Sequence, residues 1–298
     1  MSVFNRMLVT GLPAVPKPIV GRVASRYVAG ESLDDAVRVI RNLNQQGAMA
    51  TLDVLGEEVS ERGKATAFVE EYLRVFEAID REKIDSNVSI KLTMLGLKID
   101  EGFCRDNVAR IVETAKRFGN FVRIDMEDHT TTDATLRIYR ELHALHGNLG
   151  VVLQAYMRRT LRDIEELPKG ASVRLCKGIY VEPRRIAWKG YETVRHNYVQ
   201  ALDKLFTQGV YVGIATHDEY LACAASALID RHGLTRDQYE FQMLLGVDEE
   251  LRRILIESGH RLRVYVPYGR DWYPYSIRRL RENPEVARHV LKAMMAGK

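Results

Sequence analysis

Short apolar runs and amphipathic helical patterns alternate along most of this 298-residue chain, and that alternation limits the fold more than any other feature. Apolar and β-branched runs predict eight strands, at 48–54, 87–92, 121–126, 151–156, 172–177, 210–216, 239–244 and 262–267. Between them, apolar residues recur at helical spacing at 68–79, 108–115, 136–142, 194–205, 221–228 and 251–255. Eight β/α alternations predict an α/β fold, a (β/α)8 barrel of the TIM type. The single glycine after the first run, Gly56, does not make the glycine-rich fingerprint of a doubly wound sheet.

Two helical patterns precede the first predicted strand. Apolar residues recur at helical spacing over 19–28, and Ser32 with Asp35 has the form of a capping box that opens a second helix. We therefore expect residues 1–46 to form an N-terminal helical arm. Residues 47–298 would form the catalytic barrel domain, including its last helices.

A face with two arginines is predicted near the C-terminus. On a helix, Tyr275, Arg278, Arg279 and Glu282 share one side. Paired guanidinium groups match a carboxylate or phosphate in geometry and charge, so this face is predicted to hold an anion. The alternative is a solvated surface with an Arg278–Glu282 ion pair, which is common on exposed helices. Pro284 then opens one extra C-terminal helix.

Every predicted strand ends in polar residues. These are Asp53, Lys91, Asp125 with Glu127, Gln154, Arg174 with Lys177, Thr216 with His217, Gln242 and Tyr265. Barrels of this type place their site at the carboxyl ends of the strands. One charged strand end is ordinarily the chain leaving the core, but convergence at all eight ends predicts a site. Its excess of lysine and arginine predicts an anionic ligand.

Composition excludes several classes of protein. The chain is 46% apolar and 28% charged, and no apolar run approaches the roughly 18 residues that would span a bilayer. The net charge of +4 is mild and no basic block alternates with aromatic residues, so nucleic-acid binding is not expected. The proline-rich start lacks the layout of a secretory signal, and Cys104, Cys176 and Cys223 do not form a disulfide framework. We expect a cytoplasmic protein.

Neither a metal ion nor a covalent nucleophile is expected at the strand ends. The acidic stretch that ends in His129, residues 125–129, is the sole candidate for metal ligation. Cys176 lies within a strand and is expected to be a buried, inert thiol. A cation-rich site with few acid/base groups suits a bound cofactor that supplies the chemistry.

Seven motifs, in order along the chain, are similar to those of the FAD-dependent proline dehydrogenases. They are Ser-Ile-Lys-Leu-Thr-Met-Leu-Gly (89–96), Arg-Ile-Asp-Met-Glu-Asp (123–128), Leu-Gln-Ala-Tyr (153–156), Val-Arg-Leu-Cys-Lys-Gly-Ile-Tyr (173–180), Ala-Thr-His (215–217), Glu-Phe-Gln-Met-Leu-Leu-Gly (240–246) and the Tyr275, Arg278, Arg279, Glu282 pattern. The chain resembles the single-function bacterial type, because the length leaves no room for the aldehyde dehydrogenase module of the bifunctional enzymes.

The resemblance implies an activity and its partners. L-proline would be oxidised to Δ1-pyrroline-5-carboxylate, the first step of proline catabolism, with hydride passing to N5 of non-covalent FAD and electrons going on to a membrane quinone. A distorted barrel would hold FAD at the carboxyl ends of its strands. Quinone reduction would require peripheral contact with the cytoplasmic membrane face. The final predicted helix has an apolar stripe, Val286, Val290, Leu291 and Met294, that could make this contact, although such a stripe more often packs on its own domain. A pyrroline-5-carboxylate dehydrogenase would act downstream.

The resemblance also implies the substrate contacts. Arg278 and Arg279 would clamp the proline carboxylate with help from Lys91. Asp125 would pair with Lys91 and position it. Glu57 would pair with the first arginine of the clamp and gate the site.

The remaining implied roles concern FAD and the proline ring. Arg174 would lie beside the flavin N5, so that Arg174 and Asp125 are the catalytic residues. FAD would be held by Met126, Gln154, Arg174, Lys177, Gly178, Ile179, Thr216 and His217. The proline ring would be walled by Tyr180, Leu244, Tyr265 and Tyr275. The large phenol of Tyr265 favours proline over hydroxyproline, because hydroxyproline-preferring members have a smaller residue there.

Two other functions stay open at this point. One is a barrel flavoprotein that acts on another cyclic or secondary amine. The other is a non-catalytic barrel that senses an amino acid or phosphate. Bound flavin would exclude the sensor, and bleaching of that flavin by proline would exclude a different amine substrate.

Overall fold

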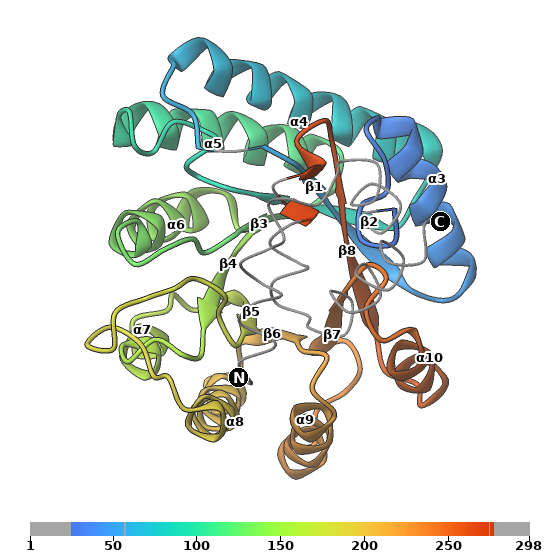
Figure 1. The fold of residues 1–298 in the computed structure, drawn as a ribbon, viewed down its shortest axis with the longest axis vertical. Coiled ribbons are helices and arrows are strands. Elements are labelled where there is room, and N and C mark those ends of the chain that lie inside the picture. The colour runs from blue at the N-terminus through green and yellow to red at the C-terminus, as the bar shows by residue number, and fades with distance from the viewer. Residues whose placement is uncertain (1–24, 57, 274, 277–298) are drawn as a thin grey trace, which may run out of the picture.

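Eight parallel strands close into a barrel in which each strand pairs with the next in sequence and β8 returns to β1 (Figure 1). This computed structural model describes residues 25–56, 58–273 and 275–276. The strands are β1 (Met49–Val54), β2 (Ser86–Ile90), β3 (Val122–Ile124), β4 (Leu149–Gln154), β5 (Ser172–Cys176), β6 (Tyr211–Ala215), β7 (Tyr239–Leu244) and β8 (Leu262–Tyr268). The predicted (β/α)8 barrel is confirmed.

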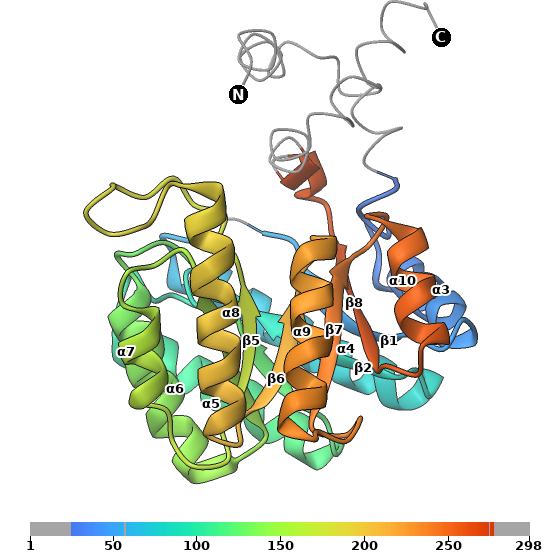
Figure 2. The same cartoon turned by 90° about the horizontal axis from the view of Figure 1, so that it is seen from below.

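Helices surround the strands, and Figure 2 shows them running alongside the barrel. They are α3 (Leu33–Gln45), α4 (Arg62–Glu82), α5 (Glu101–Arg117), α6 (Thr132–His146), α7 (Thr160–Glu165), α8 (Tyr191–Thr207), α9 (Glu219–His232) and α10 (Glu249–Glu257). The long connection from β5 to α8 stands out at the carboxyl end of the strands in Figure 2. Within the described ranges, no helix is long and apolar enough to cross a bilayer.

The apolar core lies between the strands and the helices. All six residues of β4 are buried, as expected for a parallel strand covered on both faces. From the helix side, Tyr72 and Phe76 of α4, Tyr139 of α6 and Tyr198 of α8 are completely buried against the barrel. Each such side chain contributes roughly 1.5–3 kcal/mol relative to exposure, which fixes the helices on the sheet.

The predicted capping box opens α3. The Oγ of Ser32 accepts from Asp35 N at 3.2 Å, and the Asp35 carboxylate accepts from Ser32 N at 3.2 Å. This helix packs against both β1 and β8. Whether residues 1–46 form an arm distinct from a barrel of 47–298 stays a prediction.

The helix predicted at 19–28 is absent from its described part, residues 25–28. Residues 25–27 form a turn, and residues 28–30 have no regular secondary structure; residues 19–24 lie outside the described residues. The reason lies in hydrogen bonds with the end of β8: Ala29 N donates to Pro267 O at 2.9 Å and Gly269 N donates to Gly30 O at 3.0 Å. These long-range bonds hold the backbone extended there.

Two other elements differ from the sequence prediction. The helix α7 has no counterpart among the predicted patterns, because six residues make too few turns for a periodicity to show. β3 is three residues long and ends at Ile124, so Asp125 and Met126 belong to the loop that follows it. That early end places the Asp125 carboxylate at the mouth of the barrel.

Candidate active site

A cavity of about 790 Å³ lies at the carboxyl ends of the strands. Every predicted site residue within the described ranges lines it: Lys91, Asp125, Met126, Gln154, Arg174, Lys177, Gly178, Ile179, Tyr180, Thr216, His217, Leu244, Tyr265 and Tyr275. The predicted gate Glu57 and the predicted clamp residues Arg278 and Arg279, with Glu282, lie outside the described residues. The barrel therefore gathers side chains from five of its strands, β4 to β8, and from loops that include those after β2 and β3, around one space.

Asp125 is the centre of a charged network at the floor of this cavity. Its Oδ1 contacts Nη2 of Arg174, and its Oδ2 accepts from the Tyr265 hydroxyl at 2.8 Å. Lys91 Nζ lies 4.0 Å from Oδ2. Burial acts to raise the pKa of Asp125, but Arg174 and Lys91 outweigh it and the pKa is lowered. Asp125 is therefore ionised and engaged on both oxygens.

Lys91 lies closer to Asp53 than to Asp125. The fully buried Asp53 of β1 accepts from Lys91 through Oδ1, whereas Asp125 is 4.0 Å from Nζ. The expected Asp125–Lys91 pair is thus the longer of two contacts. β1 and β2 are neighbours in which Asp53 pairs in register with Ser89, two residues before Lys91, and this brings the two side chains together.

The Lys91–Asp53 pair keeps the ammonium charged. Burial acts to lower the pKa of Lys91, but Asp53 and Asp125 outweigh it and the pKa is raised. For Asp53, burial raises the pKa, and Lys91 opposes that effect. A lysine held between two carboxylates at the cavity floor remains a cation at neutral pH.

The guanidinium of Arg174 is fixed from three directions. It contacts Asp125, donates from Nη1 to Ser89 Oγ at 3.2 Å, and lies with its Cζ 5.2 Å from the centre of the Tyr265 ring. Burial acts to lower the pKa of Arg174, but Asp125 outweighs it and the pKa is raised. The site thus holds a rigid cation that needs no rearrangement to act.

A second cationic cluster lies beside the loops after β5 and β6. The Asp218 carboxylate accepts from Lys177 Nζ at 3.1 Å, Tyr191 Oη at 2.9 Å and Arg195 Nη2 at 2.6 Å. Burial opposes ionisation of Asp218, but bonds from Arg195, Tyr191 and Lys177 outweigh it and hold the pKa well below its usual range. Lys177 and Arg195 share the Asp218 carboxylate, and Arg195 also pairs with the exposed Glu192 at 3.2 Å.

Sequence reasoning gave no role to several of these residues. Asp53 was noted only as a polar strand end, and Asp218 directly follows the predicted His217. Tyr191 and Arg195 belong to α8, and no motif marked them. Adjacency in sequence could have pointed to Asp218, but the contribution of α8 depends on how the helix packs.

The loop glycine and the histidine of the predicted set have defined geometry. Gly178 has a φ of +106°, and a Cβ there would lie 2.2 Å from the Tyr156 ring, so only glycine fits. Leu244 N donates to His217 Nε2 at 2.8 Å, which makes Nε2 the acceptor of a neutral ring. Both contacts shape the wall between β5 and β7.

Cys176 of β5 lines the cavity. Burial raises the pKa of its thiol to about 11, although Arg174 acts in the opposite direction. The Sγ lies 3.6 Å from Leu153 O. A protonated thiol of this kind is a poor nucleophile at neutral pH, consistent with the expectation of an inert residue.

A parallel (β/α)8 barrel with a cation-rich cavity at the carboxyl ends of its strands has the architecture of a barrel enzyme that acts on an anionic substrate. Among the described residues, no three His, Cys, Asp or Glu side chains are placed to hold a metal ion. The charges at the site come instead from lysine and arginine, held by buried aspartates.

Comparison with known proteins gives the family. The chain matches the family model described as proline dehydrogenase over residues 36–292. It is 38% identical over 281 residues to a proline dehydrogenase of Deinococcus radiodurans, covering 92% of this chain and 91% of the relative. It is 36% identical over 272 residues to proline dehydrogenase 2 of Bacillus subtilis, covering 91% and 90%. The chain belongs to the proline dehydrogenase family, whose activity is the first step of proline catabolism.

A solved structure shares the fold. The crystal structure of proline utilization A from Bdellovibrio bacteriovorus, inactivated by N-propargylglycine, matches with a TM-score of 0.82 and 23% identity. The match covers 88% of this chain and 32% of that one, so this chain spans about a third of that protein. The resemblance to the single-function bacterial enzymes is confirmed by the two bacterial relatives, which this chain covers almost entirely.

Proposed function

We propose that this cavity oxidises L-proline to Δ1-pyrroline-5-carboxylate with non-covalently bound FAD as hydride acceptor, and that the electrons pass on to a quinone. The observation that carries the proposal is the buried Arg174, a fixed cation held by Asp125 and Ser89 at the floor of the cavity. Family membership supports the substrate, and the chemistry of the walls supports the cofactor.

The residues present fit a flavin nucleotide. A volume of about 790 Å³ lies within the roughly 300–1,000 Å³ typical of ligand pockets. The neighbouring cations Lys177 and Arg195, which Asp218 holds in place, suit a pyrophosphate, which paired cations bind well. The close packing of Gly178 on Tyr156 brings backbone near the space, as nucleotide-binding loops do. FAD would contact the eight residues assigned to it from the sequence, and we add Arg195 to that set.

The substrate would bind at the Lys91 side of the cavity. The charged Lys91, with Arg278 and Arg279 of the predicted clamp, would hold the proline carboxylate. The cavity residues Tyr180, Leu244, Tyr265 and Tyr275 would enclose the ring. Such walls exclude water and hold the ring in one orientation.

Loss of a hydride from the ring carbon C5 of unprotonated proline leaves a protonated imine, and its N–H proton is then released to water. FAD, when bound, supplies the acceptor for the hydride. Arg174 would stabilise the negative charge that the cofactor gains, at no cost of reorganisation. Asp125 is a weak base because its pKa is lowered, so its part is to hold Arg174 and Tyr265 in place. The amine would arrive unprotonated from solution.

The visible spectrum of the purified protein tests this proposal. A flavin band near ~450 nm that bleaches on anaerobic addition of L-proline is the expected result. A colourless protein that also takes up no added FAD would exclude the cofactor. If the flavin bleaches only with another cyclic amine, that amine and not proline is the substrate.

Quinone reduction and membrane contact belong to the same proposal. A membrane quinone as acceptor implies peripheral contact with the cytoplasmic membrane face, and the product would be passed to a pyrroline-5-carboxylate dehydrogenase. Co-sedimentation with anionic vesicles, together with reduction of a soluble quinone analogue, measures both parts. If the protein reduces the quinone analogue but does not bind the vesicles, the quinone acceptor is supported and the membrane contact is excluded.

A further inference from the structure

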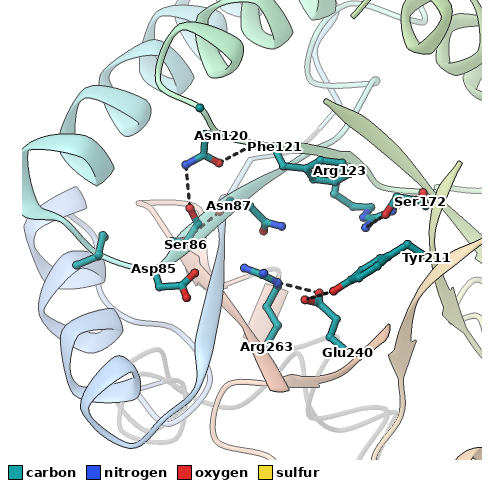
Figure 3. A pocket seen from close by; sticks show the side chains of 12 residues that line it. Asp85, Ser86, Asn87, Asn120, Phe121, Arg123, Ser172, Tyr211, Glu240 and Arg263 are labelled. Atoms are coloured by element: carbon teal, nitrogen blue, oxygen red, sulfur yellow. Dashed lines mark hydrogen bonds and ion pairs between the residues drawn. The ribbon is translucent and has the colours of Figure 1, made fainter. Parts of the chain in front are cut away.

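A second cavity, of about 480 Å³, lies at the opposite end of the barrel, where the strands begin (Figure 3). Ser86, Ser172 and Tyr211 are the first residues of β2, β5 and β6, and Arg263 and Glu240 are second in β8 and β7. The proposed function uses no residue of this cavity. Barrels of this type do their chemistry at the other end, so this cavity needs a separate explanation.

At this end of the barrel Glu240 forms an ion pair with Arg263, and both of its carboxylate oxygens accept hydrogen bonds. Arg263 Nε donates to Glu240 Oε1 at 2.8 Å, and the Tyr211 hydroxyl donates to Glu240 Oε2 at 2.9 Å (Figure 3). Gln242 Nε2 adds a bond to Oε1 at 2.6 Å. Both oxygens of Glu240 are therefore engaged by neighbouring side chains, and Glu240 acts on the pKa of Arg123 only from beyond ion-pair distance.

Arg123 is a buried cation with neutral partners. Its Nη1 donates to Ser172 O at 2.6 Å and Val151 O at 3.2 Å, and its Nη2 donates to Ser172 Oγ at 2.9 Å. No described carboxylate lies within 4.0 Å of its guanidinium nitrogens. A guanidinium has more N–H groups than these bonds use, so donors on Nε and Nη2 remain for a ligand.

The space around Arg123 is built for its guanidinium. A Cβ on Gly150 would lie 2.3 Å from Arg123 Nη1, so glycine at that position of β4 leaves the room that the side chain occupies. Burial, with a smaller effect of Arg174, lowers the pKa of Arg123 to about 10. The group is still charged at neutral pH, and an anion beside it would offset the cost of burying that charge.

Asn87 supplies an unused acceptor in the same cavity. Its Oδ1 is buried and receives no hydrogen bond from the described residues. Buried amide oxygens are normally paired, because an unpaired one costs about 1–3 kcal/mol. The cavity thus offers donors from Arg123 and an acceptor from Asn87, while Asp85 at its mouth is exposed and screened by water.

We propose that this cavity binds a small oxyanion that also carries a hydroxyl or N–H donor, with the oxyanion on Arg123 and the donor on Asn87 Oδ1. A hydroxycarboxylate or an amino acid has this chemistry, and so does hydrogen phosphate. A simple carboxylate satisfies only one half of the site. The cavity is separate from the one that takes the substrate, and the ligand is not consumed there.

Titration calorimetry on the full-length protein as purified tests this, with glycolate and acetate as probes at constant ionic strength. Glycolate is expected to bind, and to bind about fivefold more tightly than acetate, because only glycolate has a hydroxyl for Asn87. Arg123→Met is expected to weaken glycolate by about tenfold or more. In Asn87→Leu the preference for glycolate over acetate should disappear. This variant tests the proposal even if Arg123→Met does not fold.

Lys91→Met is the matched control, since it removes a cation from the substrate cavity instead. Glycolate binding that persists in Lys91→Met and is lost in Arg123→Met supports the proposal. If Lys91→Met loses glycolate binding and Arg123→Met retains it, glycolate binds in the substrate cavity and the proposal is overturned. Absence of binding by both probes to the wild type would also overturn it, and would mean that the cavity holds only water.

Discussion

Lys91 Nζ, just after β2, contacts Oδ1 of the fully buried Asp53 on the neighbouring strand β1. Asp53 does not line the cavity, so it acts on a ligand through the cavity residues beside it, of which Lys91 makes the direct contact. The substrate-binding cation is thus positioned by a carboxylate beneath it, and Asp125 is left to hold Arg174 and Tyr265.

Asp53→Asn is expected to reduce kcat/KM for proline by roughly 10- to 100-fold, because Lys91 loses the contact that positions it. FAD content should stay near one per chain, since Lys91 lies on the substrate side. Steady-state kinetics with a flavin-to-protein ratio measures both. Asp163→Asn removes another buried aspartate, paired with Arg159 away from the cavity, and should leave the kinetics intact. Wild-type kinetics in Asp53→Asn would refute the positioning role.

Arg279→Ala is expected to raise KM for proline by roughly 30- to 100-fold and to change the affinity for FAD less than about twofold. The reason is that the predicted clamp would face the substrate carboxylate. Arg281→Ala is the matched control, because Arg281 lies off the Tyr275–Glu282 face on a helix. Comparable losses of proline and FAD affinity would contradict the assignment.

Tyr265 is expected to set the preference for proline over hydroxyproline. Its hydroxyl is tied to Asp125 at 2.8 Å and lies 3.4 Å from Lys91 Nζ, so the ring is held in one place and cannot turn aside for a larger substrate. Tyr265→Ser should raise the ratio of kcat/KM for hydroxyproline over proline by about tenfold. The two substrates are compared in both proteins. Equal kcat/KM for them in the wild type would remove this hypothesis.

Asp218 should stabilise the fold in a pH-dependent way. Its pKa is lower in the folded chain than in the unfolded chain, so its contribution is complete above the unfolded value of about 4 and is lost as pH falls toward the folded value. Asp218→Asn is expected to reduce the free energy of unfolding by about 1–3 kcal/mol at pH ~7, with a smaller difference at pH ~3.5. Urea unfolding at both pH values measures this.

The exposed pair Arg105–Asp106 provides the control for Asp218. Asp106→Asn should change the free energy of unfolding by less than about 0.5 kcal/mol at either pH. An Asp218→Asn difference that grows on acidification would have the wrong sign for a lowered pKa and would count against the cluster.

Gly150→Ala is expected to destabilise the protein by about 2 kcal/mol or more. The new Cβ would meet Arg123 Nη1 at 2.3 Å and Ser172 O at 2.7 Å, and the strand leaves no room to shift. Gly63→Ala, in α4 with open space around it, should instead stabilise by about 0.5–1 kcal/mol through helix propensity. Thermal or urea unfolding compares the two. A neutral Gly150→Ala would mean that the guanidinium can move aside, which would weaken the case for a rigid anion site.

Local sequence patterns were enough to predict the barrel and the end of it that carries the site. Strand and helix periodicities are local, and eight alternations of them leave one closed parallel arrangement whose polar strand ends converge. For that reason Asp125, Arg174 and Tyr265 could be placed at one cavity before any contact was known. The family motifs added roles for them that stay predictions.

Which side chains contact one another becomes apparent only in the folded structure. Lys91 pairs with Asp53 because of the register between β1 and β2, and Arg195 reaches Asp218 because of how α8 packs beside β6. The chain near Ala29 is extended and not helical because it hydrogen-bonds to the end of β8. Each of these outcomes depends on residues far apart in sequence, and local propensity carries no information about such distances. The environment of Arg123 is of the same kind, since only the closed barrel shows that no described carboxylate lies within 4.0 Å of its guanidinium nitrogens.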